Sequence, residues 1–154
     1  MVLNIMSDRI ENKHTGVGEP WAILRHGKPL NNRQQGLLDK LPEYGSRVVV
    51  GKDDVSMMDL SALTAKVGVE FAMFTRGQER LIVRGDERRV NISAHKAVEL
   101  NRMGYKWSGH THPGDGLNVL RSSPGDDTIL KAFNQRTSVI YNSVGQYRTF
   151  VNID

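Results

Sequence analysis

Cysteine is absent from this sequence of 154 residues. Its absence excludes disulfide bonds, cysteine-ligated zinc and a cysteine nucleophile. Long apolar runs are absent too: no stretch approaches the ~18 residues that span a bilayer, and residues 1–6 are too short and too polar for a signal peptide. We therefore predict no membrane partner, and a location that is either cytoplasmic or delivered by secretion as part of a larger protein.

Aromatic residues are scarce, at 6% of the chain, which leaves few side chains on which nucleic-acid bases could stack. The net charge is +4, and the densest basic stretch, residues 76–89, contains five arginines. Glu79, Asp86 and Glu87 dilute that stretch. Nucleic-acid-binding proteins usually cluster basic residues with aromatic ones, so the composition does not favour a nucleic-acid partner.

The length fits one domain with a sizeable core. Residues 1–46 are rich in glycine, proline and asparagine and contain only short apolar groups, which predicts a flexible N-terminal extension with a strand and a short helix in its later part. Such a start is typical of the C-terminal part of a longer protein. From residue 47 onward the pattern is regular, and we assign residues 47–154 to the functional domain.

Within residues 47–154, hydrophobic periodicity, capping residues and turn signals predict alternating strands and helices. The expected strands are 47–50, 69–75, 79–84, 88–92, 105–112, 137–141 and 147–151, and the expected helices are 53–67, 93–104 and 123–133. Ser56 and Asp59 form a capping-box pattern at the start of the first helix, and Gly68 is a stop signal after it. This order predicts an α/β fold with a mixed sheet.

Two histidines, His110 and His112, lie one residue apart at the end of a predicted strand and are followed by Pro113. Because side chains alternate between the two faces of a strand, both imidazoles point the same way. With a nearby carboxylate they make three ligands for a divalent metal and leave the fourth tetrahedral position for water. That arrangement is typical of a catalytic rather than a structural zinc site.

The carboxylate candidate opens the next predicted helix, in the segment Ser123-Pro124-Gly125-Asp126-Asp127. Ser123 and Asp126 also fit a capping box that needs no metal, so the pattern has a purely structural explanation. The third ligand is either Asp126 or Asp127. Asp126 is preferred because it keeps the Ser-x-x-Asp spacing.

A strand ending in Gly-His-x-His-Pro, a loop, and Ser-x-x-Asp at a helix start together resemble the JAMM motif of JAB/MPN-type zinc metalloproteases. The resemblance covers roughly residues 47–154. It implies a curved mixed β-sheet flanked by helices, related to the cytidine-deaminase architecture. The connection 113–122 is about three residues longer than is usual in the family, and loops accept such insertions at small cost.

The resemblance also implies a role for each residue that matches the motif. His110, His112 and Asp126 would bind Zn²⁺, and Glu70, which follows the first predicted helix, would accept a proton from the attacking water and return it to the leaving amine. Ser123 would donate a hydrogen bond to the oxyanion. The implied function is a zinc-dependent hydrolase that cleaves a peptide or isopeptide bond in a protein or peptide substrate.

Two alternatives stay open at this stage. The chain fits a C-terminal effector or toxin domain of a larger bacterial or phage protein, which would act on nucleic acid and be neutralised by a cognate inhibitor (immunity) protein. The absence of cysteine, the basic charge and the irregular residues 1–46 are compatible with that role. A non-catalytic scaffold of the same fold is disfavoured, because all five motif positions are filled.

Overall fold

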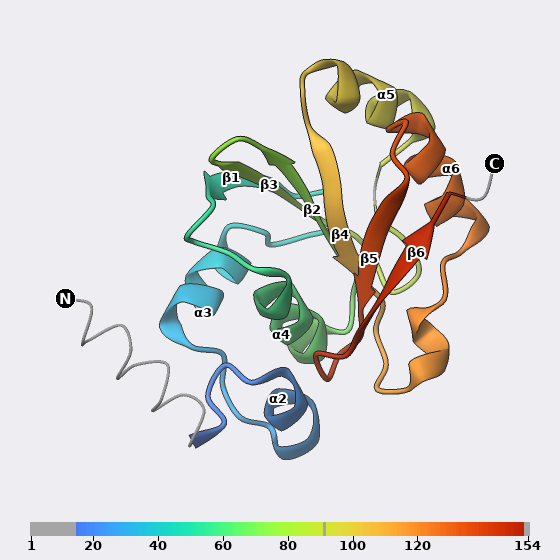
Figure 1. Cartoon of the computed structure of the whole chain (residues 1–154). Helices are drawn as coiled ribbons and strands as arrows, with labels where there is room; N and C mark the ends of the chain where they lie inside the picture. The colour runs from blue at the N-terminus through green and yellow to red at the C-terminus, as the bar shows by residue number, and fades with distance from the viewer. Residues whose placement is uncertain (1–14, 91, 153–154) are drawn as a thin grey trace.

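The computed structural model of the chain describes residues 15–90 and 92–152, which form a mixed α/β fold (Figure 1). Its strands are β1 (Arg47–Gly51), β2 (Phe71–Arg76), β3 (Glu79–Arg84), β4 (Lys106–Thr111), β5 (Thr137–Tyr141) and β6 (Tyr147–Val151). Its helices are α2 (Pro20–His26), α3 (Asn32–Asp39), α4 (Met57–Val67), α5 (Ala94–Arg102) and α6 (Pro124–Ala132), with a 3-10 turn, η1 (Leu117–Leu120). None of the described helices is long and apolar enough to cross a membrane.

The six strands form one open sheet in the order β1-β3-β2-β4-β5-β6. The pairing of β4 with β5 is parallel, whereas the other neighbouring strands run antiparallel. The sheet is therefore mixed and has helices on its faces, as the sequence predicted.

Both faces of the sheet are covered, with α4 on one face and α5 and α6 on the other (Figure 1). The alternation along β2 shows why: Phe71 and Met73 enter the core under α4, whereas Ala72 and Phe74 enter the core under α5 and α6. A strand buried on both faces reads as a continuous apolar run, and β2 begins with four buried residues in a row.

The capping box and the glycine stop that the sequence predicts for α4 are both present in the structure. Ser56 is the N-cap, its side chain accepts from the Asp59 N–H, and the Asp59 side chain accepts from the Ser56 N–H. Gly68 ends the helix with φ of 73°, a left-handed conformation that favours glycine. The helix starts at Met57 rather than at residue 53, because the cap residue fixes the first turn.

The structure differs from the expectation for the N-terminal part of the chain. Residues 1–14 lie outside the described residues, but residues 15–46 contain α2 and α3 and no strand. Ile23, Leu30, Leu37 and Leu41 are buried in the core under α4, so this part is packed rather than a flexible extension. The short apolar groups were too sparse to show periodicity, yet each fills a gap beside α4.

A second difference concerns residues 88–92. No strand forms among the described residues between β3 and α5. Instead, the backbone N–H groups of Arg88 and Arg89 both donate to Asp86 Oδ1, at 2.8 and 2.9 Å. This side-chain-to-backbone turn competes with strand pairing, as aspartate commonly does.

A bulge in β4 determines which side chains face the same core. Phe74 of β2 pairs with Trp107, whereas the adjacent Met73 pairs with Gly109, so Ser108 is an extra residue. Residues three apart on a regular strand face opposite sides, but the bulge brings Trp107 and His110 together with their ring centroids 4.8 Å apart.

We predict that Leu37→Ala lowers the free energy of unfolding by about 2–5 kcal/mol, because it leaves a cavity in the core under α4. Leu37 is 5% exposed, whereas Leu24 on α2 is 40% exposed, so Leu24→Ala is the matched control and should change stability by less than about 0.5 kcal/mol. Urea unfolding followed by circular dichroism measures both. Equal, small effects would show that α3 is not part of the cooperative core.

Candidate metal centre

The two histidines converge at the end of β4. His110 lies within the strand and His112 lies one residue beyond it, where its backbone N–H donates to Tyr141 O at 2.9 Å and extends the pairing with β5. Their Nε2 atoms are 3.0 Å apart. The alternation of side chains along the strand therefore brings both imidazoles to one place, as expected.

Asp126 brings a carboxylate oxygen to the same place from the first turn of α6. Its Oδ2 atom lies 3.1 Å from the Nε2 atom of each histidine. The same oxygen accepts a hydrogen bond from the Ser123 N–H at 2.9 Å, and Ser123 Oγ accepts from the Asp126 N–H at 3.0 Å. The capping box and the contact with the histidines thus exist together, while Asp127 is exposed.

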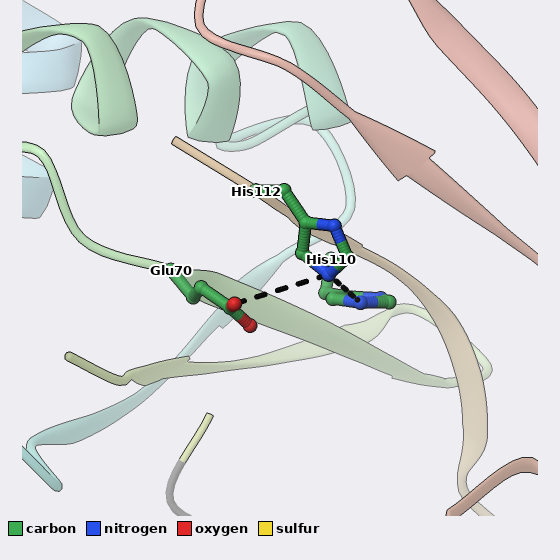
Figure 2. A group of neighbouring side chains, drawn as sticks. All are labelled: Glu70, His110 and His112. Atoms are coloured by element: carbon green, nitrogen blue, oxygen red, sulfur yellow. Dashed lines mark hydrogen bonds and ion pairs between the residues drawn. The ribbon is translucent and has the colours of Figure 1, made fainter. Parts of the chain in front are cut away.

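Glu70 approaches from the residue before β2, as Figure 2 shows. It is 4% exposed, and its Oε2 atom is 3.8 Å from His112 Nε2. Thr111, between the two histidines, accepts a hydrogen bond from the Phe71 N–H at 2.9 Å, which ties the residue after Glu70 to the histidine segment. Glu70, His110 and His112 offer ligand atoms within 4.8 Å of one another and could hold a metal ion.

The backbone carbonyl of Val119 determines the tautomer of His112. This carbonyl lies 2.6 Å from His112 Nδ1 and can only accept, so Nδ1 must carry a proton. In a neutral imidazole the other nitrogen, Nε2, then presents a lone pair. That lone pair faces the Asp126 oxygen and His110 Nε2, so two acceptors meet unless a proton or a metal cation lies between them.

The pKa values of the two carboxyl groups move in opposite directions. Burial, opposed by the charge of His112 and reinforced by that of Asp126, raises the pKa of Glu70 from 4.5 to about 8. Burial also acts to raise the pKa of Asp126, but hydrogen bonds from His110 and His112 outweigh it and hold that pKa well below its ordinary value. At neutral pH and without a metal, Asp126 is therefore ionised and Glu70 holds a proton.

The histidines also differ from one another. Complete burial lowers the pKa of His110, so that imidazole stays neutral. Burial acts in the same direction on His112, but the hydrogen bond with Asp126 and the charge of Glu70 outweigh it and raise its pKa. The neutral form is the one that ligates metals.

A buried turn holds the loop that follows His112. Asn142, fully buried after β5, donates to Gly116 O at 3.2 Å, and the Ser143 N–H donates to Gly114 O at 2.8 Å. These contacts support the loop that contains Val119. Sequence reasoning missed Asn142 and Val119, because each acts through a contact between segments distant in sequence and neither belongs to a motif.

Comparisons of the chain with protein-family models, curated proteins and solved structures find no significant match. The interpretation of the site therefore rests on its residues and their geometry.

We predict that Glu70→Gln stabilises the metal-free protein at high pH. The folded-state pKa of Glu70, about 8, exceeds its ordinary value of 4.5, so ionising this buried group opposes folding. The free-energy cost of ionising Glu70 in the folded protein is absent below about pH 4.5, grows between about pH 4.5 and pH 8, and is complete above about pH 8. We expect the variant to be more stable than the wild type by up to a few kcal/mol at pH 9.

Urea unfolding in the presence of a chelator, at pH 5 and at pH 9, measures this difference. Glu87→Gln, at an exposed position, is the control, and it should change the free energy of unfolding by the same amount at the two pH values. A Glu70→Gln effect that is the same at pH 5 and pH 9 would contradict the raised pKa.

Proposed function

We propose that the chain is a zinc-dependent hydrolase of the JAB type that cleaves a peptide or isopeptide bond. One observation carries the proposal: two imidazole nitrogens and a carboxylate oxygen lie 3.0–3.1 Å from one another, beside the buried Glu70. The elements that supply these groups, and their order along the chain, resemble those of the JAMM motif.

The donor atoms fit zinc in number, kind and spacing. Zinc binds imidazole nitrogen and carboxylate oxygen at about 2.0–2.2 Å, and catalytic zinc sites use three protein ligands. Tetrahedral bonds of that length separate the donors by roughly 3.3–3.5 Å, close to the 3.0–3.1 Å between these donor atoms. The lone pair of His112 Nε2, which otherwise faces acceptors, would then have a partner.

Asp126 is the better third ligand, and Glu70 the better proton carrier. The Asp126 oxygen lies 3.1 Å from both imidazoles, whereas the Glu70 oxygen lies 3.8 Å from His112. A ligand has to be ionised, as Asp126 is, while a group that takes and returns a proton works best with a pKa near the ambient pH. The pKa of Glu70 is about 8 without a metal, and the charge of a bound cation would lower it toward the ambient pH, where the group can both take and return a proton.

Each group in the proposed site would have its own role in the hydrolysis. When bound, zinc supplies a Lewis acid that polarises a carbonyl group and makes water acidic enough to attack at neutral pH. Glu70 takes the proton of the attacking water and delivers it to the leaving amine. Ser123 Oγ already accepts from the Asp126 N–H, so its own O–H is available to donate to a developing oxyanion.

We predict that Asp126→Asn weakens zinc binding by more than roughly 100-fold, because changes to groups that merely orient metal ligands already cost about 10–100-fold. Asp127→Asn, the adjacent exposed control, should leave the affinity unchanged. Competition against a chromophoric chelator measures both on untagged protein. If Asp126→Asn keeps its zinc while Glu70→Gln loses it, Glu70 is the third ligand and its role as proton carrier is wrong.

We predict that zinc-loaded wild-type protein cleaves amide bonds and that Glu70→Gln lowers the rate by about 10²–10⁴-fold while retaining zinc, since it removes the proton carrier alone. Mass spectrometry of a peptide library and of lysine-linked isopeptides measures the activity. The exposed Glu87→Gln variant is the control. Equal activity in Glu70→Gln would point to a contaminating protease.

Plasmid DNA and RNA belong in the same assay. Zinc-dependent cleavage of phosphodiester bonds in place of amide bonds would instead support the effector that acts on nucleic acid.

A further inference from the structure

A pocket of about 440 Å³ adjoins the candidate metal centre on the face of the sheet covered by α5 and α6. Ser123 and Asp126 line it, so a molecule in the pocket lies beside the proposed catalytic groups. Its volume falls within the range of small-ligand sites, ~300–1,000 Å³. Much of its wall is apolar, formed by Phe74, Val90 and Ile129, among others.

The rest of the lining includes two basic side chains. Arg88 and Arg89 line the pocket, against the single acidic side chain of Asp126, which is paired with the two imidazoles. The backbone N–H groups of both arginines are held by Asp86, which fixes the turn. Both side chains are exposed, and within the described parts of the chain neither guanidinium donates a hydrogen bond to a protein group.

One buried residue of the pocket wall has a donor that lacks an acceptor. Trp107 is 3% exposed and lines the pocket, and its indole Nε1–H has no hydrogen-bond partner among the described residues. A buried N–H without an acceptor costs about 1–3 kcal/mol, and tryptophan usually finds a partner for it. Because Trp107 lines the pocket, its indole N–H signal is a probe for molecules that bind there.

We propose that this pocket binds the part of the substrate next to the cleaved bond, and that this part combines a large apolar side chain with a carboxylate. The apolar wall takes the side chain, and Arg88 and Arg89 take the carboxylate. The carboxylate is either the C-terminus of a peptide or an acidic side chain beside the apolar residue. The link to a cleaved bond rests on the proposed function.

Binding of small probes tests the pocket without any hydrolysis. N-acetyl-leucine against its amide tests a terminal carboxylate, and acetyl-Glu-Leu-amide against acetyl-Gln-Leu-amide tests a side-chain carboxylate. The readout is the indole N–H signal of Trp107 in ¹⁵N-labelled protein, distinguished from that of Trp21 by a Trp21→Phe variant. Titrations are run on zinc-free and zinc-loaded protein, because a carboxylate can also bind the metal.

We expect one carboxylate probe to shift the Trp107 signal and to bind roughly tenfold more tightly than its uncharged partner, with or without zinc. The double change Arg88→Glu and Arg89→Glu should abolish that preference. Arg148→Glu, at an exposed position on β6, is the control and should keep it. The probe pair that shows the preference identifies the source of the carboxylate.

Equal binding of charged and uncharged probes, or a preference that survives the double change, would overturn the inference. Binding that requires zinc and is unchanged by the double arginine substitution would also overturn the inference, but it would not count against the proposed hydrolase. The expected preference in a protein that hydrolyses none of the amide substrates would support the pocket and count against the proposed function.

Discussion

The contact between Asp126 and the two imidazoles is the interaction on which the site depends. It joins the first turn of α6 to the end of β4, two elements that are otherwise connected by a loop. In the structure without a metal, protons on the imidazoles hold the three donor atoms together, because hydrogen bonds from His110 and His112 to Asp126 offset the cost of burying its charge. The Val119 carbonyl accepts a hydrogen bond from the proton on Nδ1 of His112, and it thereby directs Nε2 of that ring toward Asp126 and His110.

The same contact would link the binding of a metal to the stability of the fold. Without a metal the site holds protons, because burial raises the pKa of Glu70 and the hydrogen bond with Asp126 outweighs burial and raises the pKa of His112. An ion that binds only the folded state stabilises it by mass action. In the absence of a metal, the two apolar cores on either side of the sheet stabilise the fold and so keep the donor atoms close together.

Sequence reasoning succeeded where the determinants are local. The caps at Ser56 and Ser123 depend on residues within one turn, and the shared direction of His110 and His112 depends only on the period of a strand. It failed where contacts are distant in sequence. The packing of residues 15–46 against α4 and the extra residue Ser108 in β4 depend on tertiary fit, for which one sequence gives no period or motif.

The capping box at the start of α6 shows why the structural and the functional interpretation of Ser123 and Asp126 need not compete. The Asp126 oxygen that accepts from the Ser123 backbone is the one that faces the imidazoles, so the cap also orients this carboxylate toward the histidines. The Ser123 hydroxyl accepts from Asp126 and keeps its own proton for another acceptor. Because the cap fixes both side chains as the helix forms, little further ordering of Ser123 and Asp126 would be needed for a metal or a substrate to bind.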